Sequence, residues 1–587
     1  MICTISFSAA YAVTISDNRV TLLNCREIIM SEEYGDFILI RNLAGVNPLK
    51  LPISCEFVLN ETYKVAYAKL PEDRSMLLED AGYTAIPKLY GLMDTESMEA
   101  AGILRVQTQP GLALTGKDTI VGVIDTGIDY THPAFRNPDG TTRILSIWDQ
   151  TENEPDLLQY GRYGHIYTQR DINQALQSEN PYDIVPQRDE NGHGTFMAGI
   201  AAGSAEADGG FTGAAPDASL IVVKLKPAKQ YLREFFQIKD GAVAFQENDI
   251  MQGLIYLLAM AYEAKKPIVI MLCLGTNQGN HSGFSLLSSV LRWAAEMPQV
   301  AVVVSSGDEA GRQHHFQGKI ASEAAYEDVE VRVGNGEKGF SMEIWAQVAE
   351  TYAISITSPS GEVIPPISVR FGRGQEIDFI FEQTKIYIDY EIVNQSSGLF
   401  LILLRLFSPT PGLWTFRIYN TNFLTGTYNI WLPIDDFIEA DTVFLRADPY
   451  ITLTMPADTL GCMAVCCYDH RNDSLYLHSS RGFTAGGVIK PDFAAPGVDV
   501  YGPRAGGGFT TRTGSSVSAA HAAGASALMM EWAVVRGNQP NISSAEISAY
   551  FVRSARRNPQ LTYPNREWGY GILDLYRVFE QMAQGRF

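Results

Sequence analysis

The stretch "TIVGVID", from Thr119 to Asp125, is an apolar run that ends on a carboxylate. Three more runs of this kind occur later in the chain, "SLIVVKL" (219–225), "PIVIMLCLG" (267–275) and "VAVVVSSG" (300–307). Long segments with helical periodicity separate them, such as "ENDIMQGLIYLLAMAYEAKK". Uniformly apolar strands that alternate with helices predict an α/β fold, with a parallel sheet covered by helices on both faces.

The overall composition limits the classes of function. A chain of 587 residues is too long for a single hydrophobic core, so we expect several domains. The formal net charge of −21 opposes binding to nucleic-acid phosphates or anionic lipid, and no Lys/Arg-rich block offsets it. No apolar run reaches the roughly 20 residues that cross a bilayer. We therefore expect neither a nucleic-acid partner nor a membrane span.

The seven cysteines are an odd number scattered over a long chain. This distribution is not typical of a disulfide framework, so we expect unpaired thiols or a reducing compartment. Cys462, Cys466 and Cys467 form the one cluster, in "GCMAVCCYD". A metal site would need a matching Cys/His pair nearby, which the sequence lacks, and the segment is typical of a buried strand.

The N-terminal region divides at Met30. Residues 1–29 fit poorly with the segment after them, because Met30 opens the acidic stretch "MSEEYGDFILIRN"; we expect Met30 to be the first residue of the native protein. The start "MICTISFSAAYAVTISDN" lacks the basic residues of a secretory signal. Residues 30–95 are predicted to form a small α+β unit, with strands in "DFILIRN" and "YKVAYAKLP" and a helix in "PEDRSMLLEDAG".

The α/β pattern of residues 96–324 is interrupted by a region of different character. Residues 325–455 contain short aromatic strands, such as "TYAISITSP", "KIYIDYEIV" and "LWTFRIYN", separated by Gly, Pro and Asn turns. This pattern predicts an all-β sandwich. Residues 456–587 return to the α/β pattern, so the sandwich is predicted to be an insertion into the α/β domain.

Three segments place a reactive side chain at the end of a strand or the start of a helix. Asp125 ends the first apolar run, at the carboxyl edge where open parallel sheets form their sites. His193 lies between glycines in "DENGHGTFMAGIAAG", and Ser515 and Ser516 open an alanine-rich helix in "TRTGSSVSAAHAAG". Each residue alone also fits a capping or packing role. Together, in the order Asp, His, Ser, they predict a catalytic triad.

The segments "VIDTGID", "NGHGTFMAGI", "SSRGFTAGGVIKPDFAAPGV" and "TGSSVSAAHAAG" resemble the subtilisin-like (S8 family) serine proteases. The resemblance implies that Ser516 is the nucleophile and that Ser515 stands where the family has threonine. It also implies that His193 is the general base and that Asp125 orients its imidazole. The chain is then expected to be a serine endopeptidase that acts on protein or peptide substrates.

The position that supplies the family's side-chain oxyanion donor, normally asparagine, is Asp308 in this sequence. An ionised carboxylate cannot donate a hydrogen bond and would repel the oxyanion, whereas a protonated one could donate. Loss of one such donor costs about 10² to 10³ in turnover. The backbone N–H of Ser516 is expected to be the second donor.

The resemblance also assigns two segments to the walls of the pocket for the substrate side chain before the scissile bond. These residues are Cys273, Leu274, Gly275, Ser305, Ser306 and Gly307. Both segments also fit plain strand ends. Cys273 departs from the serine that the family has at this position.

The inserted sandwich, the short N-terminal unit and "TGIDYTHPAFRNPDGTTRILSIWDQT" are similar to the Csp germination proteases of anaerobic spore formers. This similarity implies that residues 30–95 are a propeptide removed by self-cleavage within Leu89–Ser97, and that the insert is a jelly roll. It also implies that the target is the precursor of a spore-cortex hydrolase.

Because the sequence shows no clear signal peptide, we expect the protein to be cytoplasmic or spore-associated. We also expect a monomer. The propeptide is an expected partner, whether or not it stays bound. Calcium is left open, because many subtilases bind it but no clean acidic loop can be assigned, and no other cofactor is expected. The alternative function is a catalytically silent sensor or scaffold, since some Csp proteins have lost triad residues; Asp308 is the residue that favours it.

Overall fold

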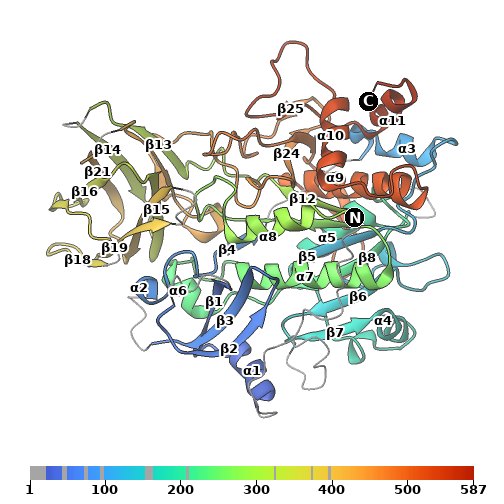
Figure 1. Cartoon of the computed structure of the whole chain (residues 1–587), viewed down its shortest axis with the longest axis horizontal. Helices are drawn as coiled ribbons and strands as arrows, with labels where there is room; N and C mark the ends of the chain where they lie inside the picture. The colour runs from blue at the N-terminus through green and yellow to red at the C-terminus, as the bar shows by residue number, and fades with distance from the viewer. Residues whose placement is uncertain are drawn as a thin grey trace.

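The four apolar runs form neighbouring strands in a nine-stranded sheet (Figure 1). The structure, a computed structural model, describes residues 21–41, 49–71, 77–92, 98–152, 163–205, 210–322, 325–371, 374–393, 398–422 and 424–586. The strand order is β25-β24-β12-β10-β5-β8-β6-β7, and β26 also pairs with β24. The bounds are β5 Ile120–Asp125, β6 Ile144–Asp149, β7 His165–Thr168, β8 Ser219–Lys224, β10 Ile268–Leu272, β12 Val300–Ser305, β24 Met463–Asp469, β25 Ser474–Leu475 and β26 Phe493–Pro496. All pairs are parallel except those of β7 and β25.

Helices cover both faces of this sheet, as the uniformly apolar strands predict. In β5, Val121 and Val123 pack with the helices of one face, and Ile120 and Ile124 pack with those of the other. The first face carries α3 (Ile103–Thr108), α5 (His193–Ala202), α9 (Ser515–Met530), α10 (Ser544–Ser554) and α11 (Leu575–Ala583). The second carries α7 (Glu247–Ala264) and α8 (Leu286–Ala295). The predicted α/β class, a mainly parallel sheet covered by helices on both faces, is confirmed.

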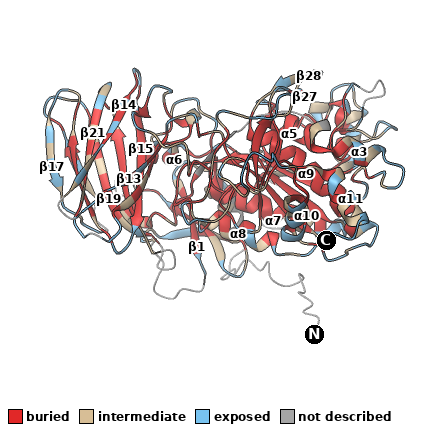
Figure 2. Ribbon diagram, turned by 90° about the horizontal axis from the view of Figure 1, so that it is seen from above, coloured by how far each residue is buried: buried red, intermediate tan, exposed pale blue. Residues whose placement is uncertain are grey.

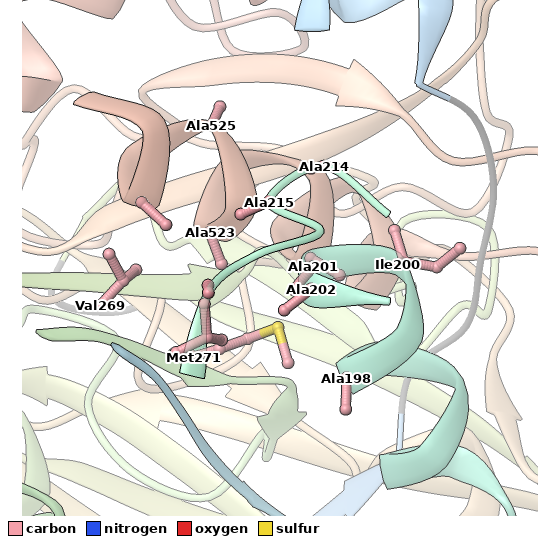
Figure 3. Close-up of a cluster of buried hydrophobic side chains, with 14 of the residues drawn as sticks. Ala198, Ile200, Ala201, Ala202, Ala214, Ala215, Val269, Met271, Ala523 and Ala525 are labelled. Carbon is pink, nitrogen blue, oxygen red and sulfur yellow. The ribbon is translucent and has the colours of Figure 1, made fainter. Parts of the chain in front are cut away.

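Small residues let α5 and α9 approach closely. Figure 3 shows Ala201, Ala214 and Ala523 in one cluster with Met271 of β10. A Cβ on Gly524 of α9 would lie 2.2 Å from Ala214 Cβ and 2.5 Å from the Ala201 carbonyl oxygen. Only glycine fits there, which fixes the position of α9 against α5.

The N-terminal unit, residues 21–92, is a three-stranded antiparallel sheet of order β1-β3-β2 with short helices. Its elements are α1 (Thr21–Met30), β1 (Tyr34–Ile40), β2 (Ile53–Val58), β3 (Tyr63–Lys69), α2 (Leu77–Ala81) and β4 (Leu89–Leu92). Helix α1 lies mostly within the segment 1–29 that the sequence pattern sets apart, and its Ile29 is buried in the core. The prediction of unpaired thiols needs correction. Cys25 of α1 is bonded to Cys55 of β2, where the two Cα atoms lie 5.6 Å apart.

The insert, β13 to β23, consists of two antiparallel sheets that enclose one core. The first sheet has the order β13-β22-β15-β20-β19-β18 and the second β17-β16-β21-β14-β23. The bounds are β13 His315–Lys319, β14 Tyr326–Val333, β15 Gly339–Gln347, β16 Tyr352–Thr357, β17 Val363–Ile367, β18 Gln375–Asp378, β19 Lys385–Val393, β20 Leu399–Phe407, β21 Gly412–Asn420, β22 Thr427–Trp431 and β23 Val443–Phe444. The insert begins before the predicted residue 325, because the short, polar β13 pairs with β22.

The remaining described elements are short. They are α4 (Gln169–Leu176), α6 (Gln230–Phe235), β9 (Phe245–Gln246), β11 (Leu274–Gly275), β27 (Val500–Pro503) and β28 (Phe509–Arg512). No helix among the described residues is long and apolar enough to cross a bilayer.

The N-terminal unit contacts the insert, the segment around α6 and the start of α7 across one buried region, here called the junction. Strand β20 of the insert is buried along nearly its whole length. Its neighbour β15 is also almost wholly buried, and Figure 2 shows the buried strands of the insert in red. Ile402 and Leu404 face the core between the two sheets, whereas Leu401 and Leu403 face the junction. The insert therefore packs against the N-terminal unit through the outer face of one of its sheets.

Two buried ion pairs lie where the N-terminal unit meets the α/β domain. Lys229 Nζ lies 2.5 Å from Asp36 Oδ1, and Lys226 Nζ lies 2.6 Å from Asp249 Oδ2. The second oxygen of Asp36 accepts hydrogen bonds from the side-chain amides of Gln246 and Asn248, each at 3.0 Å. The Asp36 carboxylate is thus saturated with partners from the α/β domain.

A buried hydrogen bond also joins the N-terminal unit to the insert. Tyr83 Oη donates to Glu343 Oε1 at 2.6 Å, and the Gly279 backbone N–H donates to Glu343 Oε2 at 2.8 Å. Burial raises the pKa of Glu343, opposed by these hydrogen bonds. All three parts of the molecule meet at this side chain.

Candidate active site

The carboxylate of Asp125 and the imidazole of His193 form a buried pair at the carboxyl edge of the sheet. Asp125 ends β5 and His193 begins α5; the residues are 0% and 1% exposed. His193 Nδ1 lies 2.8 Å from Asp125 Oδ1 and 2.9 Å from Oδ2. The Thr126 backbone N–H donates to Asp125 Oδ1 at 2.7 Å, which fixes the carboxylate. With Nδ1 held by Asp125, Nε2 is the nitrogen that can exchange a proton with a substrate or a nucleophile.

The loop that carries His193 is tied to β5 by a side chain that the sequence interpretation missed. Asp189 accepts hydrogen bonds from the Thr126 hydroxyl at 2.7 Å and from the Thr195 hydroxyl at 2.6 Å. It also accepts from the backbone N–H groups of Gly192 and Thr195, both at 2.8 Å. The signal for it is an aspartate placed just before a Gly-flanked histidine at a helix start, where it satisfies free backbone N–H groups.

Ser516 lies in the first turn of α9, next to the strand end that follows β10. Its hydroxyl donates to the Cys273 carbonyl oxygen at 3.4 Å, and its own carbonyl accepts from the Cys273 thiol at 3.1 Å. Leu272 pairs with Ile124, so Cys273 and Asp125 end neighbouring strands. The sheet therefore brings the Ser516 hydroxyl to the edge that holds Asp125 and His193.

The thiol of Cys273 is a neutral donor in this arrangement. Burial, and secondarily the charge of Asp125, raise the pKa of Cys273 well above its ordinary value. The thiol keeps its proton at neutral pH and donates it to the Ser516 carbonyl. A cysteine can thus replace the expected serine without losing the donor.

A model of the subtilase family matches residues 116–365 and 448–571, together more than half of the chain. The chain belongs to the subtilase family. Of the residues between the two matched segments, 366–444 belong to the insert and 445–447 follow its last strand. The match therefore covers both parts of the α/β domain and the three segments that carry Asp125, His193 and Ser516.

The solved structure titled "Structure of the Clostridium Perfringens CspB protease" is similar to this subtilase, with a TM-score of 0.73 and 31% identity. The similarity covers 83% of this chain and 98% of that one. The PIII-type proteinase of Lactococcus lactis subsp. cremoris (strain SK11) is 23% identical over 482 residues, which are 76% of this chain but 23% of that protein. Serine protease AprX of Bacillus subtilis (strain 168) is 33% identical over 158 residues, 26% of this chain and 27% of that protein. The subtilase thus spans about a quarter of the length of these two relatives. Membership of the subtilase family and the similarity to the CspB protease over 98% of that chain support a serine endopeptidase.

Asp308 of this subtilase faces the start of the helix that carries Ser516. Both of its carboxylate oxygens lie 3.1 Å from the Ser515 backbone nitrogen, and the Ser515 hydroxyl lies 3.3 Å from Oδ2. The Gly307 backbone N–H donates to the Ser515 hydroxyl at 3.1 Å. The carboxylate is therefore turned toward the first residue of the helix and accepts from the backbone N–H and the hydroxyl of Ser515.

The two segments assigned to the pocket walls follow adjacent strands. Leu274 and Gly275 form β11, directly after Cys273, and Ser305 ends β12. The Ser306 backbone N–H donates to the Val465 carbonyl oxygen at 3.0 Å. Since β10 and β12 are paired, both segments leave the sheet at the edge that holds Ser516.

The thiols of Cys462, Cys466 and Cys467 are buried in and beside β24. Burial raises the pKa of Cys462 to about 12. Among the residues that the structure describes, no group of three or more His, Cys, Asp or Glu side chains is placed to hold a metal ion.

Proposed function

We propose that Asp125, His193 and Ser516 form the catalytic triad of an active endopeptidase. The observation that carries this proposal is the His193 Nδ1 to Asp125 hydrogen bond of 2.8 Å, at the sheet edge where Ser516 contacts Cys273. The Ser516 hydroxyl attacks a peptide carbonyl and passes its proton to His193 Nε2. Asp125 stabilises the imidazolium, which then protonates the leaving amine; a water molecule hydrolyses the acyl-enzyme by the same steps.

We further propose that the N-terminal unit is a propeptide that this site removes. Its last described strand, β4, pairs antiparallel with β11, where Leu92 is opposite Leu274 and Gly91 is opposite Gly275. On its other side β4 pairs with β9. A peptide held as an added strand between two edges is a common mode of peptide recognition. Because β11 directly follows Cys273, β4 leads the chain toward Ser516.

This pairing narrows the proposed cleavage site. The predicted range is Leu89–Ser97, and Leu89–Leu92 is the paired strand β4. Residues 93–97 lie outside the described residues. We propose that the chain is cut after Leu92 and before Met98.

Intact-mass measurement tests self-cleavage. The wild-type chain is expected to yield an N-terminal fragment that ends within 92–97, whereas Ser516→Ala is expected to remain a single chain. Ser518→Ala is the matched control, because Ser518 lies on the same turn of α9 and donates to the Ala495 carbonyl instead. Identical masses for wild type and Ser516→Ala would contradict autoprocessing.

We propose that the physiological target is a protein precursor, such as that of a spore-cortex hydrolase, and that the protein is spore-associated. The similarity to the CspB protease of Clostridium perfringens over 98% of that chain supports this choice. Incubation of the processed protein with the purified precursor tests it. Cleavage that requires Ser516 is expected, and an intact precursor beside an active enzyme would contradict it.

The alternative is a catalytically silent sensor or scaffold, favoured by Asp308 at the oxyanion position. Labelling by a fluorophosphonate probe separates the two functions, since the probe reacts only with an activated serine. We expect wild type to be labelled and Ser516→Ala not. Absence of wild-type labelling between pH 5 and pH 9 would favour the silent function.

A further inference from the structure

The helix that carries the proposed nucleophile has no capping side chain of its own. The residue before α9 is Gly514, which offers no side-chain oxygen, although N-terminal N–H groups of a helix need acceptors. Asp308, more than 200 residues earlier in the chain, lies at this helix end. Its two oxygens lie at equal distances of 3.1 Å from the Ser515 backbone nitrogen.

The Ser515 hydroxyl adds two further hydrogen bonds between α9 and the segment that carries Asp308. The Ser515 hydroxyl donates to Asp308 Oδ2 at 3.3 Å and accepts from the Gly307 backbone N–H at 3.1 Å. Gly307 has φ +94, and a Cβ there would lie 2.5 Å from Thr454 Oγ1. Glycine is therefore required at position 307, and its N–H anchors the backbone beside Asp308 to Ser515.

We infer that Asp308 is a positioning residue that caps α9 through Ser515 and thereby fixes Ser516 against Cys273. This inference rests on the proposed function of Ser516. A carboxylate at the N-terminus of a helix satisfies its N–H groups and interacts favourably with its dipole. In this arrangement Asp308 accepts hydrogen bonds and does not donate one to the oxyanion, for which the Ser516 backbone N–H remains. The cap orders the nucleophile and lowers the stabilisation of the oxyanion.

A double-mutant cycle of Asp308→Ala and Ser515→Ala tests the cap. We make it in the Ser516→Ala background, so that every variant keeps its N-terminal unit attached and no variant needs activity. Each single change is expected to lower the unfolding temperature. The double variant is expected to unfold at about the same temperature as the less stable of the two single variants, because both changes remove the same contact. Asp499→Asn is the charge control: it removes one negative charge near Thr513, and the contacts that it weakens, to Thr513 and to the exposed Arg471, do not involve α9. Fully additive shifts, or no shift with Asp308→Ala, would overturn the inference.

Kinetics with Ser516 present separate capping from oxyanion donation. Asp308→Asn retains a side-chain oxygen for the Ser515 N–H and gains an N–H₂ donor. Its kcat on a peptide substrate is expected to rise, by up to about 10²-fold, with KM unchanged. Asp308→Ala is expected to lower kcat by roughly 10²-fold, because Ser516 is displaced. An equal loss of kcat in both variants would overturn the inference. An inactive wild type would contradict the proposed function. The double-mutant cycle would still test the cap, because it measures unfolding temperatures and needs no activity.

Discussion

The sheet edge that carries the proposed triad, here called the catalytic edge, and the junction both bury charged groups, but the two regions place those groups differently. Asp125, His193 and Ser516 lie at the ends of a strand and two helices, where the chain changes direction. Asp36 lies within strand β1, and Asp249 lies within helix α7. At the edge, the pair leaves one imidazole nitrogen for proton transfer. At the junction, each carboxylate is matched to a lysine and to amide groups, so it binds and does not react.

The largest expected effect is at the catalytic edge. Asp125→Asn keeps the shape of the side chain but favours the wrong imidazole tautomer, so we expect kcat to fall by about 10⁴. The rate of fluorophosphonate labelling and the hydrolysis of a peptide substrate measure this. The unfolding temperature should change little in comparison. Activity within tenfold of wild type would show that Asp125 does not orient His193.

A change at the junction should act on stability. Asp36→Leu leaves the Lys229 ammonium buried without its carboxylate, at a cost of about 3–5 kcal/mol. We expect the processed N-terminal unit to dissociate during size-exclusion chromatography. The double variant Asp36→Leu with Lys229→Met is expected to retain the unit, because it removes both charges. Asp240→Asn, which breaks an exposed pair with Lys338, is the control and should have no effect on retention. If the double variant lost the N-terminal unit as readily as Asp36→Leu does, the result would contradict the role of the buried charge pair.

A third change concerns His521, which lies on the catalytic helix α9 but takes no part in the proposed chemistry. Burial lowers its pKa to about 3, from the ordinary value near 6.5. Protonation therefore favours the unfolded chain, and the associated stability is present above pH 6.5 and is lost as the pH falls toward 3. At pH 5 the loss is about 2 kcal/mol. Urea unfolding at pH 7 and pH 5 should show that His521→Met loses less free energy of unfolding between these pH values than wild type does. Equal losses in the two proteins would contradict the role of His521.

The smallest expected effect lies where the N-terminal unit meets the insert. Tyr83→Phe removes the hydroxyl that donates to Glu343 and keeps the ring, while Gly279 and Trp345 still donate to the carboxyl. We expect a loss of about 1 kcal/mol in urea unfolding. Tyr83→Ala is the comparison variant, with a larger loss because the packing against Trp345 also disappears. Equal losses would assign the whole contribution to the hydrogen bond.

The same contrast explains what the sequence could and could not predict. The residues of the proposed triad end an apolar strand or open a small-residue helix, so Asp125, His193 and Ser516 stand out in local motifs. The junction has no local motif: Asp36 and Lys229 are ordinary charged residues whose burial depends on contacts between distant segments. Asp308 combines the two cases, a residue found by its local motif and a residue whose contacts depend on distant segments. Its position was predictable from the strand that precedes it, but its hydrogen bonds to Ser515 depend on the packing of α9.

The junction also makes the order of synthesis relevant. The ribosome completes the N-terminal unit long before it makes strand β20, and Tyr83 is separated from its partner Glu343 by 260 residues. Contacts this distant in sequence close late and slow the folding of a domain. Until the insert has emerged, the apolar residues that face Leu401 and Leu403 have no complete covering. A nascent chain of this protein must therefore hold its first unit incompletely buried through most of translation, and a chain that stops before β20 leaves that surface for aggregation.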